Sequence, residues 1–262
     1  MNISLIITTY NWKEALQLSL QSALDQTLSP LEIIVADDGS GPETAELVQK
    51  MGSSSPIPVH HSWQEDCGFR VARSRNKAIA MARGEYLILI DGDMVLEPHF
   101  VADHCRYARS GFFVQGSRVL LSQSFTKQLL ANGSSGIFLG SNCMGNRKNS
   151  LRSPFLARMF STKSKRLPGI RSCNFAFWKE DALRVNGFNE AFVGWGREDS
   201  EFAARLINYG LSRRNLRFQA IGYHLYHPMN TREGLTANQE LLRKTIEEKR
   251  LWCEQGLSQH LQ

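Results

Sequence analysis

The sequence lacks the features that mark membrane-spanning and secreted proteins. No run of about 18 uninterrupted apolar residues occurs in its 262 positions, which argues against a membrane-spanning helix. The first residues, from Met1 to Ile7, contain neither a basic leader nor a small-residue cleavage site. We therefore expect a soluble chain in the cytoplasm.

Cysteine is scarce and follows no pattern. The sequence has no CxxC pair, and an odd number of scattered cysteines fits neither a disulfide framework nor a zinc site. We expect all five to be reduced thiols; they are Cys67, Cys105, Cys143, Cys173 and Cys253.

Glycine-rich phosphate loops are also missing. Neither a GxGxxG nor a Walker A sequence is present, which argues against a dinucleotide-binding fold and a P-loop enzyme. A sugar nucleotidyltransferase would use an α/β sheet and Mg²⁺, but it would need a glycine-rich basic loop after the first strand. That enzyme class is disfavoured for the same reason.

Acidic residues are absent from one long interval. None occurs between Asp103 and Glu180, whereas thirteen Lys or Arg occur from Arg106 to Lys179, and the net charge is +6. A solvated basic loop is one interpretation. The other is contact with an anionic partner, such as phosphates, an anionic glycan or lipid headgroups.

The remaining composition, with 42% hydrophobic and 21% charged residues, suits one large domain or two fused halves. Short apolar runs alternate with helical patterns in the first hundred residues, which predicts an α/β fold with a mostly parallel sheet. The predicted strands are Ile3–Thr8, Glu32–Ala36 and Tyr86–Ile90, and the predicted helices are Lys13–Gln26 and Val71–Ala82.

The later part of the chain is less regular. We expect a mobile loop over residues 131–171, which are rich first in Gly, Ser and Asn and then in basic residues. The other predicted elements are strands at 112–121 and 172–178, and helices at 179–185, 200–209 and 236–253. We expect the last helix to pack on the protein and not to anchor it in a membrane, because its apolar stripe is thin.

Two carboxylates follow the most apolar predicted strand. Asp91 and Asp93, separated by Gly92, come directly after Tyr86–Ile90, where the carboxyl edge of an open α/β sheet binds ligands. Two such carboxylates can hold Mg²⁺ or Mn²⁺, which bridges diphosphate oxygens. An ordinary Asp-Gly turn is the alternative.

Polar residues also follow the first two predicted strands. Thr8-Thr9-Tyr10-Asn11 and Asp37-Asp38-Gly39-Ser40 would open into the same crevice. An aromatic ring, hydroxyls and carboxylates suit a nucleobase and a ribose. The second run is equally typical of a turn and helix N-cap.

Paired acids begin a later predicted helix. Glu198 and Asp199 follow Gly194-Trp195-Gly196-Arg197, and this position suits a general base. Acidic residues favoured by the helix dipole are the alternative. Further on, the imidazoles of His224 and His227 offer nitrogen ligands for the same metal, although lone histidines are more often structural.

The segments at residues 8–11, 37–40 and 91–93 resemble those of the inverting glycosyltransferase family 2, whose members have the GT-A fold. The segment 194–199 with a later histidine is similar to the catalytic segment of β-1,4-galactosyltransferases and bacterial chondroitin-type polymerases. The resemblance implies a Rossmann-like nucleotide-sugar half, residues 1–104, fused to an acceptor-binding and catalytic half, residues 105–262, within one continuous GT-A domain.

The resemblance also implies residue roles. Asp93 would bind Mn²⁺ (or Mg²⁺) with Asp91 and one of two histidines, where spacing slightly favours His227 over His224. Asp199, with Glu198 beside it, would be the catalytic base. The donor-binding residues would be Thr8, Thr9, Tyr10, Asn11, Asp37, Asp38, Asp91, Gly92, Trp195, Arg75 and Asn76; the last two lie in a segment that is similar to one approaching the donor in the family.

The predicted function is metal-dependent, inverting transfer of a sugar from a nucleotide-sugar, expected to be a UDP-sugar, to a hydroxyl of a glycan or glycolipid. We expect single additions in bacterial surface polysaccharide or lipopolysaccharide synthesis, an acceptor that can be anionic, peripheral contact with the cytoplasmic membrane face and no nucleic-acid partner. The alternative is a non-catalytic carbohydrate- or polyanion-binding module. That function would leave four carboxylates without a role, namely Asp91, Asp93, Glu198 and Asp199.

Overall fold

The computed structural model describes residues 1–133, 143–228 and 234–261. Its strands are β1 Ile3–Thr9, β2 Glu32–Asp37, β3 Val59–Trp63, β4 Tyr86–Asp91, β5 Met94–Leu96, β6 Phe112–Gln115, β7 Arg118–Leu121, β8 Cys143–Met144, β9 Thr162–Ser164, β10 Asn174–Trp178, β11 Ser212–Asn215 and β12 Gly222–His224. Its α-helices are α1 Lys13–Leu24, α2 Pro42–Ser53, α3 Val71–Met81, α4 Phe100–Tyr107, α5 Gln123–Asn132, α6 Pro154–Phe160, α7 Lys179–Arg184, α8 Glu198–Asn208 and α9 Leu235–Glu247, with 3₁₀ turns η1 Arg147–Ser150 and η2 Leu257–His260.

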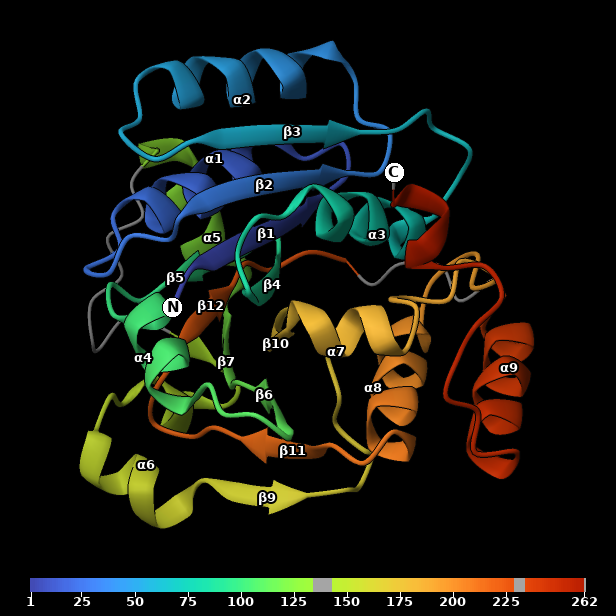
Figure 1. Ribbon diagram of the computed structural model, residues 1–262. Coiled ribbons are helices and arrows are strands. Elements are labelled where there is room, and N and C mark those ends of the chain that lie inside the picture. Colours follow the sequence, from blue (N-terminus) through green and yellow to red (C-terminus); the bar gives the residue numbers. More distant parts are fainter. Residues whose placement is uncertain (134–142, 229–233, 262) are drawn as a thin grey trace.

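A large mixed sheet runs through the molecule, in the order β3-β2-β1-β4-β10-β6-β11-β9 within the described ranges. The strands from β3 to β4 are parallel, β10 is antiparallel to both of its neighbours, and β11 is again parallel to β6. Helix α2 lies along β3 at one end of this sheet, and α6 and β9 lie at the other (Figure 1). The predicted α/β class with a mostly parallel first half is confirmed.

The central strands are buried on both faces. In β4, Tyr86, Ile88 and Ile90 pack into one apolar cluster with helices α1, α2 and α4. Leu87 and Leu89 point to the other face and pack with α3, α7 and α8. A strand covered on both sides needs apolar residues at every position, which is why the uninterrupted run in the sequence predicted it correctly.

A smaller sheet crosses the end of the large one. Its strands have the order β5-β12-β7-β8 in the described residues, with β12 antiparallel to β5 and parallel to β7. A third apolar cluster, which includes Val95, Val119 and Tyr223, joins it to α1 and α5. In this sheet, β12 brings residues 222–224 next to β5, which directly follows the end of β4.

Several elements were not predicted, namely α2, β3, β5, α4, α5, β8, η1, α6, β9, β11, β12 and η2. The single strand predicted over residues 112–121 is wrong. The strand is interrupted at Gly116, where a Cβ atom would lie 2.2 Å from the side-chain amide of Asn174. On either side of this glycine, β6 belongs to the large sheet and β7 to the small one. Hydrophobic alternation alone does not reveal such a change of sheet.

The mobile loop predicted over residues 131–171 is also wrong in its later part, because η1, α6 and β9 lie there; residues 134–142 lie outside the described residues. Helix α9 ends at Glu247, six residues before the predicted end at Cys253. The thiols of Cys67, Cys105, Cys173 and Cys253 are free, and the side chain of Cys143 lies outside the described residues. None of the helices in the described ranges is long and apolar enough to cross a membrane.

The division of the chain after residue 104 stays a prediction. That position lies inside α4, and β10 from the second part pairs directly with β4 from the first. The two parts therefore share one sheet.

Candidate active site

The ends of the parallel strands bring several predicted site residues together. Thr8 in β1 lies in register with Asp91 at the end of β4, and Thr9 lies in register with Asp37 at the end of β2. Parallel strands present their carboxyl ends at the same edge, so three separate sequence motifs converge on one region.

The candidate metal group consists of Asp93, His224 and His227. The Oδ2 atom of Asp93 lies 3.5 Å from Nε2 of His224 and 3.3 Å from Nε2 of His227. Among the described residues these three side chains form a set with ligand atoms within 4.8 Å of one another. Strand β12 produces this arrangement, because His224 pairs with Met94 directly after Asp93.

The electrostatics of the group suit a cation. Burial raises the pKa of Asp93 to about 6 and lowers the pKa of His224 to about 4, so that imidazole is neutral near pH 7 and keeps a lone pair for a metal. The Oδ1 atom of Asp93 is buried without a hydrogen-bond partner. One carboxylate and two imidazoles are a donor set that Mn²⁺ accepts, so the residues fit the predicted ion.

Asp91 bonds to Arg75, and its predicted role toward the metal and the donor stays a prediction. Its Oδ1 accepts a bond from Nη2 of Arg75 at 3.3 Å, and the same guanidinium donates to Glu198 at 3.0 Å and to Ser172 at 2.8 Å. The Nε atom of Arg75 lies 3.3 Å from the hydroxyl of Thr8. This buried arginine, on α3, thereby connects β1, β4 and α8.

Asp199 is the less constrained of the two acids that begin α8. Its Oδ1 accepts bonds from the backbone and hydroxyl of Ser200, whereas Glu198 is buried and paired with Arg75. Burial, together with the charge of Glu198, raises the pKa of Asp199 to about 7. A carboxyl that gains and loses its proton near neutral pH is suited to acid–base chemistry.

The loop that carries Trp195 is held from both sides. Gly194 and Gly196 have φ angles of +79° and +101°, which favour glycine. The amide of Asn238, on α9, donates to the carbonyl groups of Val193 and Gly196. The ring of Trp195 remains 41% exposed, so it is available to contact a ligand.

The residues after β1 differ in their exposure. Thr8 and Thr9 are buried, whereas Tyr10 is 49% exposed and its hydroxyl donates to Asp66 at 2.9 Å. Asn11 adopts a positive φ of 46° and accepts a bond from the backbone of Gly41. Tyr10 and Asn11 are therefore the exposed members of this motif.

Gly92 allows two strands to meet closely. Its backbone nitrogen donates to the carbonyl of Thr8 at 2.7 Å. A Cβ atom at this position would lie 3.0 Å from that oxygen and 3.2 Å from the side chain of Thr9. A larger residue would push the two carboxylates of the motif away from β1.

The carboxylates after β2 already have partners. Asp37 is fully buried, accepts bonds from the backbone of Gly39 and Ser40, and contacts His61 at 2.8 Å. It closes the turn before α2, as the alternative interpretation held, although the helix itself begins after Gly41 without a side-chain cap.

Asp38 anchors the segment that leads into α3. Its two oxygens accept from the amide of Gln64 at 2.6 Å and from the backbone of Arg70 at 2.9 Å. Burial raises its pKa to about 6.

Asn76 does not lie with the other predicted donor-binding residues. Its side chain is fully buried and exchanges hydrogen bonds with the backbone of Phe188, and it donates to Glu190. All of its polar atoms are occupied by this loop, so the geometry gives it a supporting position.

Sequence reasoning missed three residues beside the site. Ser172 accepts from Arg75, the ring of Trp12 lies edge-on to His227 with centroids 6.1 Å apart, and the charge of Arg118 acts on both Asp93 and His224. Of the three, only Trp12 could have been found from local sequence, because it directly follows the motif at residues 8–11.

The fold and the site together define the class. A sheet of this order, with acidic residues at its carboxyl edge, is a GT-A glycosyltransferase fold. The chain superimposes on residues 1–349 of TarS from S. aureus with a TM-score of 0.65 over 99% of this chain and 68% of that one, at 16% identity.

Residues 4–177 match glycosyl transferase family 2, and the chain belongs to this family of enzymes. Residues 155–228 also match a family described as the N-terminal domain of galactosyltransferase. Both predicted resemblances are thereby confirmed.

Two curated relatives cover different shares of the chain. Hyaluronan synthase from Pasteurella multocida is 25% identical over 80% of this chain and 23% of its own length. The UDP-Glc:α-D-GlcNAc-diphosphoundecaprenol β-1,3-glucosyltransferase WfaP from Escherichia coli is 33% identical over 35% of either chain. The chain thus spans about a third or less of the length of these relatives.

Proposed function

We propose that the protein is a metal-dependent, inverting glycosyltransferase that uses a UDP-sugar. The observation that carries this proposal is the group formed by Asp93, His224 and His227 at the carboxyl edge of the sheet. Family membership supports sugar transfer, and the carboxylate–imidazole donor set supports a divalent cation, Mn²⁺ or Mg²⁺.

Asp93 and one or both histidines would hold this cation. When bound, it would neutralise the negative charge that develops on the departing nucleoside diphosphate. The exposed ring of Tyr10 and the hydroxyl of Thr9 border the same edge and would receive the uridine. The name of the WfaP relative specifies UDP-Glc as its donor, which supports a UDP-sugar here.

Asp199 would take the proton from the acceptor hydroxyl while that oxygen attacks the anomeric carbon. The bond to the nucleoside diphosphate breaks on the opposite side, so the anomeric configuration inverts and no covalent enzyme intermediate forms. Arg75 would hold the side chain of Glu198 in place beside the base. Trp195 would provide an apolar face for a sugar ring.

The acceptor would be a hydroxyl of a glycan or a lipid-linked glycan in bacterial surface polysaccharide or lipopolysaccharide synthesis. The relatives, a hyaluronan synthase and a transferase for a diphosphoundecaprenol-linked sugar, support this class. A non-catalytic carbohydrate- or polyanion-binding module is the competing function, and it gives no reason for Asp93 and two imidazoles to converge within 4.8 Å.

Peripheral membrane contact is proposed for the surface of α6. Phe155 and Met159 are 71% and 61% exposed, and Phe160 is also exposed. Arg158 and Lys163 lie in the same interval without acidic residues. Exposed apolar side chains among basic ones favour the interface of an anionic membrane.

A panel of UDP-, GDP- and dTDP-sugars, measured for binding and slow hydrolysis, tests the proposal. With Mn²⁺ we expect one UDP-sugar to bind and to be hydrolysed, and EDTA or Asp93→Ala to abolish both. Asp25→Ala, which removes an exposed carboxylate after α1, is the control and should bind as the unmodified protein does. Metal-independent binding of a glycan without any nucleotide-sugar would favour the binding module.

A further inference from the structure

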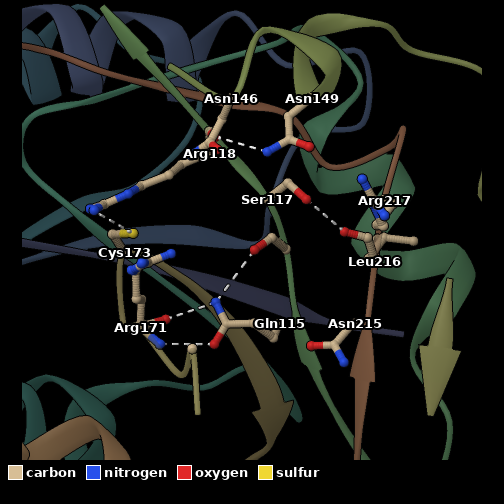
Figure 2. A pocket seen from close by; sticks show the side chains of 12 residues that line it. Gln115, Ser117, Arg118, Asn146, Asn149, Arg171, Cys173, Asn215, Leu216 and Arg217 are labelled. Carbon is tan, nitrogen blue, oxygen red and sulfur yellow. Dashed lines mark hydrogen bonds between the residues drawn. The ribbon is translucent and has the colours of Figure 1, made fainter. Parts of the chain in front are cut away.

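A polar pocket lies beside the candidate site, and no step described above uses it. Its volume is about 320 Å³, at the lower end of the range for small-molecule sites. Figure 2 shows the side chains of Arg118, Arg171 and Arg217 around it. The lining residues are Gln115, Gly116, Ser117, Arg118, Asn146, Asn149, Gly169, Arg171, Cys173, Asn215, Leu216 and Arg217.

The pocket carries an excess of positive charge. Three arginines line it, and no Asp or Glu does. In the described part of the chain the arginine ion pairs involve other residues, such as Arg75, Arg152 and Arg205. An unpaired guanidinium cluster in a concave site attracts an anion with oxygen acceptors.

Arg118 is the most enclosed of the three. Its Nη1 lies 3.9 Å from the sulfur of Cys173, and its Nε is buried without a hydrogen-bond partner. Burial raises the pKa of the Cys173 thiol to about 12, so the sulfur is uncharged at neutral pH. A buried donor that lacks an acceptor favours a ligand that supplies one.

The pocket lies at the same sheet edge as the metal group but several strands away from the nucleotide side. It is formed at the ends of β6 and β11 and at the start of the antiparallel β10. The residues proposed for uridine follow β1, on the other side of β4 in the strand order. Neighbouring strands are about 4.8 Å apart, so β6 lies about 10 Å beyond β4.

Two connections join the pocket to the chemistry. Ser172, between two lining residues, accepts the bond from Arg75 at 2.8 Å, and Arg75 also holds Glu198. The strand that begins with Arg118 pairs with β12, placing Leu120 opposite His224. The pocket is thereby connected to Glu198, the neighbour of the proposed base, and to the metal group.

We propose that this pocket binds an oxyanion, a phosphate or a carboxylate, carried by the acceptor glycan. The assignment rests on the proposed glycosyltransferase function. The guanidinium groups of Arg118, Arg171 and Arg217 bind the oxyanion, and the amide of Asn146 faces the sugar. An acceptor without the negative charge is a poor substrate.

The test measures binding of inorganic pyrophosphate, glucuronate and neutral methyl glucoside by calorimetry in EDTA, so that no metal contributes. We expect pyrophosphate or glucuronate to bind and methyl glucoside to bind far more weakly; which of the two anions binds tells phosphate from carboxylate. The double variant Arg171→Gln/Arg217→Gln removes two exposed charges and should weaken that binding about tenfold or more.

The double variant Lys165→Gln/Arg166→Gln is the matched control, because it removes two exposed charges of the same basic interval outside the pocket. It should leave oxyanion binding unchanged. Equal binding by both double variants, or equal binding of methyl glucoside, would overturn the proposal.

UDP with Mn²⁺ provides the second arm. Its affinity should be the same in the unmodified protein and in Arg171→Gln/Arg217→Gln. Weakening of UDP binding to the same extent as pyrophosphate would place the donor diphosphate in the pocket and overturn the acceptor assignment. If the unmodified protein binds pyrophosphate in EDTA but no UDP with Mn²⁺, the proposed use of a UDP-sugar fails while the pocket assignment stands.

Discussion

The charged residues on the two sides of β4 differ in whether they have partners within the protein. On the β1–β2 side each carboxylate has partners within the protein: Asp37 closes a turn, Asp38 holds the segment before α3, and Asp91 bonds to Arg75. On the β6–β11 side Arg118 and Arg171 have no carboxylate partner among the described residues and face a pocket. The charged groups on the β1–β2 side are paired without a ligand, whereas the β6–β11 side carries positive charge that a ligand can neutralise.

The largest expected effect is a difference between Asp91 and Asp93, the two carboxylates at the end of β4. Asp93→Asn should lower kcat/KM by on the order of 10³-fold or more, because it removes the carboxylate of the metal group. Asp91→Asn should weaken Mn²⁺ binding much less, since Asp91 bonds to Arg75. Steady-state kinetics and Mn²⁺ titration of both variants make this comparison, and an equal loss of Mn²⁺ affinity would make Asp91 a ligand too.

A smaller effect is expected at the proposed base. Asp199→Asn should lower kcat by about 10²–10³-fold while UDP binding with Mn²⁺ is retained. Because burial raises the pKa of Asp199 to about 7, the carboxylate fraction falls as the pH drops below 7. The rate of the unmodified enzyme should therefore fall towards acid pH.

The pH profile of the variant provides the check. Asp199→Asn should lack the acid limb near pH 7, and circular dichroism should show an unchanged fold. An unaltered limb in the variant would assign that titration to another group.

The buried arginine should matter for stability as well as for activity. Arg75→Gln would leave Glu198 and Asp91 without their charge partner, and breaking a buried pair in this way costs about 3–5 kcal/mol. Urea unfolding measures the loss. Arg184→Gln, which removes an exposed arginine from its pair with the exposed Glu180, is the control and should change the free energy of unfolding far less.

The smallest expected effect concerns the α6 surface. Phe155→Ser/Met159→Ser should weaken binding to vesicles of anionic phospholipid about tenfold, because two apolar side chains no longer enter the interface. Vesicle co-sedimentation measures it. Trp252→Ser, at another exposed apolar residue, is the comparison variant, and equal losses would show that α6 has no special role.

In the first half of the fold, the sequence predicted β1, β2, β4, α1 and α3 because their signals are local, but it missed α2, β3, β5 and α4. The uninterrupted apolar run of β4 and the polar residues after β1 and β2 identify strands and their carboxyl ends without knowledge of other parts of the chain. The change of sheet at Gly116 depends on contact with Asn174, 58 positions later, and no local pattern encodes it.

The residues of the candidate site also differ in how far local sequence can predict them. Asp93 was identified by its position after a strand, and the histidines by their type together with a family resemblance. Asn76 was assigned to the donor from the resemblance, but its role depends on a loop more than a hundred residues away. The pocket arginines at 118, 171 and 217 lie far apart in sequence, so that only the folded chain brings them together.

The most direct test of the central claim is a crystal structure of the protein grown with Mn²⁺ and UDP, with the metal located by anomalous scattering. The account predicts a single strong peak at about 2.0–2.3 Å from an oxygen of Asp93 and from Nε2 of His224 or His227, with the diphosphate bound to the same ion. A peak elsewhere, or UDP bound at this edge without a metal, would contradict it.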